Sequence, residues 1–141
     1  MLCVFGAFAE DISPEEQLFH GARDGDKAAV EAALDAGLDP DLVFLSTDQT
    51  ALDVAVLYRQ AEIVQLLISR GADPDLPGDN HPPAVIVAAD QEFVDVLEVL
   101  ASQGAELNDV YWQGYNPLGG SIINDRDGSI EILMRHGADP Y

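Results

Sequence analysis

The stretch Arg70–Asn80, RGADPDLPGDN, decides the fold because its Gly-Ala-Asp-Pro motif returns along the chain. GAELN begins at Gly104, GADPY at Gly137 and a weaker GLDPD at Gly37. The four glycines therefore lie 34, 33 and 33 residues apart. A fixed period of this length is typical of repeat proteins, in which similar units stack in a row.

The segment before each glycine contains two short apolar bursts at helical spacing. Before Gly71 these are Leu52–Val56 and Ile63–Ile68, and the polar sequence YRQAE separates them. Each segment therefore predicts two helices of two to three turns. The one extra residue between the first two glycines is expected in the loop 38–49, because the later segments align without a gap.

The ends of the predicted helices carry the expected capping signals. Ser13, followed by Pro14 and Glu16, is a capping box that should begin the first helix. Thr50 and Asn116 stand in the same place before later helices. Each second helix is expected to end at its glycine, which adopts the left-handed conformation without steric cost.

These motifs resemble the ankyrin repeat family, whose unit of about 33 residues is a β-turn followed by two antiparallel helices and a loop. The resemblance rests on TALDVAV from Thr50, Glu62-Ile63-Val64, and the GAD of Gly71 and Gly137. It implies an all-α ankyrin repeat solenoid, in which helix-turn-helix units stack and are joined by β-hairpin-like loops. It covers residues 14–141, with repeats at about 14–46, 47–79, 80–112 and 113–141.

Three departures from the family pattern affect the predicted stability. Pro83 replaces the capping threonine of the third unit, at a cost of about 1 kcal/mol. Gly119 and Gly120 lie inside the first helix of the fourth unit, at about 1 kcal/mol each, so this unit should be the least stable. Three apolar residues of its second helix either turn inward, are covered by a partner, or mark a clipped sequence: Ile130, Leu133 and Met134.

The chain is strongly acidic, with 26 Asp and Glu against six Lys and Arg and a formal net charge of −20. Its basic residues are scattered, so a phosphate-binding surface for nucleic acid or an anionic membrane is not expected. The charge favours a basic protein partner, or it only keeps the surface soluble; both interpretations stay open. Cys3 is the single cysteine and excludes an internal disulfide.

Residues 1–13 form a separate N-terminal segment that opens with the apolar run MLCVFGAFA. The run is too short to span a bilayer. Ala7-Phe8-Ala9 resembles a signal-peptide cleavage site, although the basic residues that normally precede the apolar run are missing. A remnant signal would place the chain in the periplasm or outside the cell. Otherwise the segment packs on the first helix pair of a cytoplasmic protein.

No catalytic, cofactor or metal site is expected. The three histidines, His20, His81 and His136, share no metal-ligand spacing. GGSII at 119–123 lacks the second glycine of a nucleophile elbow, and the repeat register puts Ser121 in a small-residue position between packed helices. NDRDGS at 124–129 would place apolar residues at two calcium-ligand positions.

In the ankyrin family, partners commonly lie along the concave side, which the hairpin tips and the exposed ends of the first helices form. Trp and Tyr dominate interface hot spots, so DVYWQGY at 109–115 draws attention, although these rings could instead pack hairpin to hairpin. The candidate binding residues at the hairpins are Phe44, Asp79, Asn80, Tyr111, Trp112, Gln113 and Tyr115. Those on the first helices are Arg23, Asp24, Leu57, Tyr58, Asp90, Gln91, Ile123 and Asn124.

The sequence therefore predicts a small, non-catalytic ankyrin module of bacterial style that is a monomer when free. It would bind a basic protein through its concave face, as an inhibitor, an immunity protein or an accessory protein. The alternative is a structural role, in which the fourth unit mediates self-association.

Overall fold

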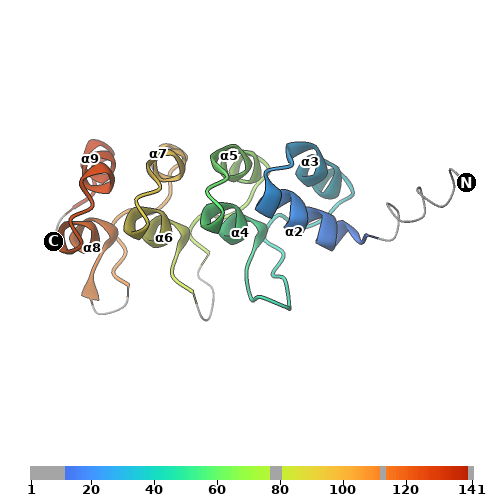
Figure 1. The fold of residues 1–141 in the computed structure, drawn as a ribbon, viewed down its shortest axis with the longest axis horizontal. Coiled ribbons are helices and arrows are strands. Elements are labelled where there is room, and N and C mark those ends of the chain that lie inside the picture. Colours follow the sequence, from blue (N-terminus) through green and yellow to red (C-terminus); the bar gives the residue numbers. More distant parts are fainter. Residues whose placement is uncertain (1–11, 77–80, 112–113, 140–141) are drawn as a thin grey trace, which may run out of the picture.

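The computed structural model describes residues 12–76, 81–111 and 114–139, and these form eight helices in four antiparallel pairs (Figure 1). Each pair is one unit, with a first and a second helix. The units are α2 (Pro14–Asp24) with α3 (Lys27–Asp35), α4 (Ala51–Leu57) with α5 (Ala61–Ser69), α6 (Ala84–Asp90) with α7 (Val94–Ser102), and α8 (Pro117–Ile123) with α9 (Asp127–Arg135).

The four units stack in a single row. Figure 1 shows the first helices side by side in one layer and the second helices in another, with the hairpins projecting beyond the first helices. Each helix packs against its counterpart in the neighbouring unit, as α4 does against α2 and α6. A single bridge between Phe44 and Gln49 is the extent of β-structure in the described ranges. The prediction of an all-α solenoid is confirmed.

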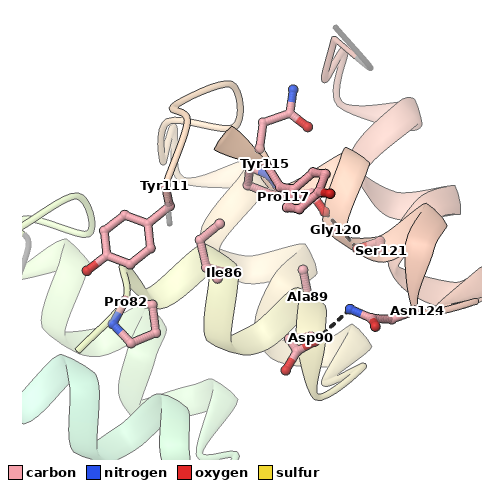
Figure 2. Close-up of a pocket in the computed structure, with 11 residues that line it drawn as sticks. Pro82, Ile86, Ala89, Asp90, Tyr111, Tyr115, Pro117, Gly120, Ser121 and Asn124 are labelled. Atoms are coloured by element: carbon pink, nitrogen blue, oxygen red, sulfur yellow. Dashed lines mark hydrogen bonds between the residues drawn. The ribbon is translucent and has the colours of Figure 1, made fainter. Parts of the chain in front are cut away.

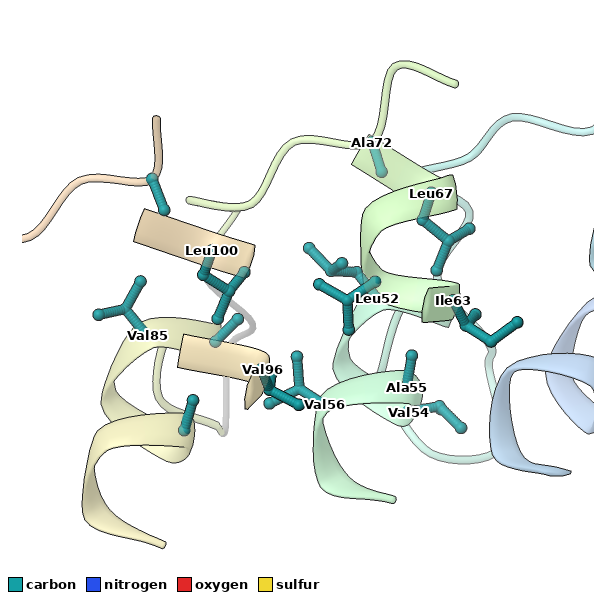
Figure 3. Close-up of a cluster of buried hydrophobic side chains, with 14 of the residues drawn as sticks. Leu52, Val54, Ala55, Val56, Ile63, Leu67, Ala72, Val85, Val96 and Leu100 are labelled. Atoms are coloured by element: carbon teal, nitrogen blue, oxygen red, sulfur yellow. The ribbon is translucent and has the colours of Figure 1, made fainter. Parts of the chain in front are cut away.

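The core is continuous from unit to unit (Figure 3). Val56 on α4 is 1% exposed, Val96 on α7 of the next unit is fully buried, and both belong to one cluster of buried side chains. Leu52 and Leu100 belong to the same cluster. Burying a side chain of this size contributes about 1.5–3 kcal/mol. A large part of this gain comes from contacts between neighbouring units.

The predicted helix caps are present. Ser13 and Thr50 each form a capping box, and Asn116 accepts a hydrogen bond of 2.7 Å from the backbone N–H of Gly119. Pro83 makes no side-chain cap, as its sequence position predicted. The helix that contains both glycines of the fourth unit still forms, and its lower stability stays a prediction.

The glycine of each GAD-like motif is the second residue after the end of the second helix and takes the left-handed conformation, as predicted. The φ values are 96°, 99°, 89° and 83° for Gly37, Gly71, Gly104 and Gly137. The same left-handed conformation ends the second helix of each unit, which is the physical reason for the recurring glycine.

The turn inside each helix pair also needs a left-handed residue, but only the first unit has glycine there. Gly25 has φ 76°, whereas Arg59, Glu92 and Asp125 have φ 57°, 57° and 54°. A non-glycine residue pays about 1–2 kcal/mol for this conformation. Two of these side chains reach the next unit. Arg59 pairs with Asp95 at 3.0 Å, and Glu92 accepts a hydrogen bond of 2.8 Å from the backbone N–H of Gly128.

The same buried position of each first helix carries a small residue, because the two helices of a unit approach closely there. Gly21, Ala55, Ala88 and Ser121 occupy it. A Cβ added to Gly21 would lie 2.8 Å from Val30 Cγ2, which leaves no room for a larger side chain. Ser121 is 1% exposed, and its hydroxyl donates to the carbonyl of Pro117 at 2.8 Å.

The apolar residues of the fourth unit divide between the core and the surface. Leu133 is fully buried and Ile130 packs partly against the core, so these two side chains turn inward. Met134 is 63% exposed on the outer side of α9. The inward alternative is therefore correct for two of the three residues.

A ladder of side-chain hydrogen bonds joins the loops that follow the second helices. The Asp41 carboxylate accepts a hydrogen bond of 2.8 Å from the backbone N–H of Asp73, and the Asp75 carboxylate accepts one of 2.8 Å from the backbone N–H of Glu106. The Asn108 side-chain oxygen accepts one of 2.7 Å from the backbone N–H of Asp139. The acceptor is thus an aspartate in two of the loops and an amide in the third.

The two aspartates of this ladder are harder to ionise than ordinary carboxyl groups. Burial, together with nearby carboxylates, raises the pKa of Asp41 and Asp75 above the usual 3.8. The folded chain therefore holds these protons more tightly than the unfolded chain. The stability they contribute is present at low pH and is lost as the pH rises through their folded pKa values.

We expect Asp75→Asn to stabilise the chain at pH 7, because the amide still accepts the bond from Glu106 but carries no charge. The gain should be below about 1 kcal/mol, since Asp75 is solvent-exposed. It should shrink as the pH falls toward the raised pKa of Asp75, where the carboxyl group itself becomes protonated. Urea unfolding at several pH values measures this. Glu62→Gln, at an exposed position, controls for the general loss of one negative charge. A less stable D75N at pH 7 would contradict the prediction.

Candidate functional site

Apolar and aromatic side chains are exposed at the ends of the first helices and at the hairpin before α8. Leu57 and Tyr58 lie at the end of α4, Ile123 ends α8, and Tyr115 precedes it. These four side chains are between 44% and 59% exposed. With Asp90, Gln91 and Asn124, they make up what we call the first-helix surface. Each of the seven is a residue that the sequence singled out.

The polar members of the first-helix surface lie at the ends of α6 and α8. Asp90, Gln91 and Asn124 are exposed, and the Asn124 amide donates to Asp90 Oδ1 at 3.2 Å across the unit boundary. Arg23 and Asp24 pair with each other through hydrogen bonds of 2.8 and 3.0 Å. This bond from Arg23 holds the pKa of Asp24 below its usual value.

Most of the basic residues pair with acids of the same chain. Arg59 contacts Asp95, Arg70 contacts Asp35, and Arg135 contacts Glu98, each across a unit boundary. With Arg23, four of the six Lys and Arg residues therefore lie in ion pairs. The 26 acids consequently leave a large excess of negative charge on the surface.

Phe44 lies away from the first-helix surface. Its ring is 8% exposed and packs edge-on against Phe19 of α2, with 5.1 Å between the ring centroids. This contact fixes the first hairpin on the first unit and removes Phe44 from the candidate binding residues. The neighbouring Leu45 is fully exposed.

Four of the candidate binding residues lie outside the described residues: Asp79, Asn80, Trp112 and Gln113. The alternative that the hairpin rings pack on one another therefore stays a prediction for Trp112. Phe44 itself packs on Phe19, which belongs to the first unit.

A groove between α6 and α8 opens on the first-helix surface (Figure 2). We call it the α6–α8 groove; its volume is about 260 Å³. Ile86 and Ala89 line it from α6, and Pro117 and Gly120 from α8. Tyr111 and Tyr115 of the preceding hairpin complete the lining, together with Pro82, Asp90, Asn116, Ser121 and Asn124.

Polar groups around the α6–α8 groove are largely bonded within the protein. Tyr111 donates its hydroxyl to the carbonyl of His81 at 2.9 Å. Asn116 uses both ends of its amide, since it caps α8 and donates to the carbonyl of Asp139. Figure 2 shows Asp90 and Asn124 bonded to each other at the end of the groove away from the tyrosines. Asp90 is the one ionisable carboxylate among the lining residues.

The sequence predicts the two tyrosines, Asp90 and Asn124 as binding residues, but it does not predict the hollow between them. The relevant signal lies in the repeat register, where Gly120 takes the place of Val87 one period earlier. Taken alone, this glycine predicts only a loss of helix stability.

The described residues contain no group of three or more His, Cys, Asp or Glu side chains placed to hold a metal ion. Two histidines serve in internal contacts. His81 Nε2 lies 3.0 Å from the carbonyl of Asp48 and 3.4 Å from the Asp53 carboxylate, and His136 Nε2 lies 2.9 Å from Glu98. Among the same residues, none of the helices has the length and hydrophobicity needed to cross a bilayer.

The stacked helix pairs, with hairpins beside the first helices, define a helical repeat solenoid. The Ankyrin repeat family model matches residues 47–79, which form the second unit. The other three units repeat the same helix pair and left-handed turns in register. The match assigns the second unit to the ankyrin repeat family, and the four units together form an ankyrin-type repeat solenoid. Ankyrin repeat domains are typically non-catalytic modules that bind other proteins.

Three relatives illustrate how this chain compares with longer proteins. It is 29% identical over 133 residues to the mitochondrial disaggregase of Bos taurus, covering 91% of this chain and 19% of that protein. It is 33% identical over 91 residues to protein PhlB of Serratia liquefaciens, covering 64% and 40% of the two chains. It is 33% identical over 67 residues to the putative ankyrin repeat protein FPV240 of Fowlpox virus (strain NVSL), covering 48% and 16%. The chain thus spans less than half the length of each.

Phe44→Ala is expected to destabilise the chain by about 3 kcal/mol, because it removes a buried ring and its contact with Phe19. Leu45→Ala is the matched control, and its effect should stay within about 0.5 kcal/mol because the side chain is exposed. Urea unfolding of both variants measures the difference. Equal stability of F44A and L45A would show that the Phe44 ring does not hold the hairpin.

Proposed function

We propose that this chain is a non-catalytic interaction module that binds a basic protein through the first-helix surface. The observation that carries the proposal is the exposed row of Leu57, Tyr58, Tyr115 and Ile123 on an acidic protein whose bases are mostly paired internally. Aromatic and apolar side chains supply the buried centre of an interface, and the solenoid presents them along one extended face.

The acidic surface supplies selectivity and speed of association. A net charge of −20 attracts a basic partner over several ångströms and raises the association rate, while it repels acidic proteins. Because the module would act by covering part of its partner, the biological role that fits best is an inhibitor, an immunity protein or an accessory protein that escorts a basic enzyme.

We expect the double variant Tyr58→Ala/Ile123→Ala to lose partner capture by more than about tenfold, because two exposed anchors are removed. The measurement is affinity capture with the tagged chain from an extract of the native source. Raising the salt from about 50 mM to about 500 mM should weaken capture by the wild-type chain.

Leu45→Ala serves as the control, since it removes an exposed apolar side chain elsewhere. Both variants should keep the helical circular dichroism of the wild-type chain. Unchanged capture by Y58A/I123A would remove the first-helix surface from the interface, and salt-independent capture would argue against a basic partner.

Self-association is a second candidate function, favoured by the outer side of the fourth unit. Ile122 occupies the register position of Val56, which the next unit covers, yet Ile122 and Met134 are exposed. Under the leading proposal the free chain sediments as a monomer. Under the second it sediments as a dimer that Met134→Glu dissociates. Analytical ultracentrifugation of both proteins at several concentrations decides between the two.

A further inference from the structure

The α6–α8 groove has a counterpart one unit earlier in the stack. The cavity between α4 and α6 is lined at register-equivalent positions, but its volume is only about 70 Å³ against about 260 Å³. Both cavities lie between consecutive first helices, so the side chains at their equivalent lining positions can be compared directly.

Two register positions carry a smaller side chain in the later groove. Val87 lines the smaller cavity, and Gly120 stands in its place in the larger one. Val56 is likewise replaced by Ala89. A Cβ added at Gly120 would have no neighbouring atom within 4 Å, so the space at this position is open.

The lining of the groove defines the chemistry of an occupant. Ile86, Ala89, Pro117 and the carbons of the tyrosines make its inner surface apolar, while its carboxylate is Asp90. The equivalent position in the smaller cavity is the apolar Leu57. Asp90 bonds a neutral amide, so the contact with Asn124 leaves its negative charge uncompensated. An apolar hollow with an acid at one end is complementary to an apolar group next to a cation.

The volume points to a side chain of a protein rather than a small molecule. Pockets for small molecules usually measure about 300–1,000 Å³. A single large aliphatic or aromatic side chain needs less space, and its burial yields a favourable transfer free energy.

We propose that the α6–α8 groove binds one apolar side chain of a basic partner, while a neighbouring arginine or lysine of that partner pairs with Asp90. This inference rests on the proposed function and specifies the recognition motif within it: an apolar residue flanked by basic ones in an extended segment. The chain's own excess of acids strengthens the attraction for such a segment.

Three capped peptides test the inference on the full chain: Ser-Arg-Leu-Arg-Ser, the same with Gly for Leu, and the same with Glu for both Arg. Titration of the isotope-labelled chain, followed by NMR, gives each affinity. We expect the first peptide to bind with shifts centred on Gly120 and Asn124. The glycine peptide should bind about tenfold more weakly, and the glutamate peptide should not bind up to about 5 mM.

Variants of the chain locate the binding. Gly120→Val restores the residue type of the smaller cavity and should weaken the first peptide about tenfold, with Gly120→Ala intermediate. Asp90→Asn should weaken it about threefold at low salt, while Glu62→Gln, an equal charge change on α5, should have a smaller effect. Since D90N leaves the groove unfilled, it keeps the test informative even if G120V folds poorly.

Three results would each overturn the inference. The leucine and glycine peptides could bind equally well, or G120V and D90N could both bind the leucine peptide with unchanged affinity. The third is that the leucine peptide fails to bind up to about 5 mM. Failure of the inference is distinguishable from failure of the proposed function. Capture of the native partner that survives G120V but is lost in Y58A/I123A would leave the first-helix surface in place and reject the groove.

Discussion

The structure depends on the burial of each unit's apolar face against the next unit. Helices of seven and nine residues are too short to be stable by themselves in water. Val56 and Val96 show how the problem is solved, since side chains of consecutive units belong to one buried cluster. The same stacking sets the first helices and hairpins beside one another. The surface proposed for partner binding is therefore a by-product of the contacts that fold the chain.

Electrostatics within the stack explain the character of that surface. Arg59, Arg70 and Arg135 each bridge one unit to another through an acid. Exposed pairs of this kind contribute little stability individually. They nevertheless place scarce positive charges in contacts between units, while Asp90 lies beside a neutral amide. The balance of charge at the first helices is set by this internal pairing.

Sequence reasoning recovered the fold because the repeat presents the same signals four times. The spacing of the glycines, the cap at Thr50 and the small residue at Ser121 each follow from local backbone requirements that a sequence displays. The position of Phe44 could not be predicted in the same way. An apolar residue in a hairpin faces the core or the solvent according to the path of the loop, and here Phe19 lies within reach.

The residues of the candidate site stay a prediction, but the repeat register explains why several of them are exposed. Register alone placed Tyr58, Tyr115 and Ile123 on one face, and all three are exposed. The groove depends instead on the absence of a side chain at Gly120. Its volume depends on how closely the neighbouring side chains approach that position. Comparing Val87 with Gly120 indicates where space could open, while its size follows only from the packed structure.

The left-handed residues inside the helix pairs have a consequence for how the chain unfolds. Arg59 and Glu92 carry backbone strain that belongs to their own unit, whereas the contacts their side chains make belong to the following one. A unit that loses its neighbour keeps the strain and loses these contacts. Fraying from the C-terminal end is thereby transmitted inward. Cooperativity between units is thus encoded in the turns as well as in the core.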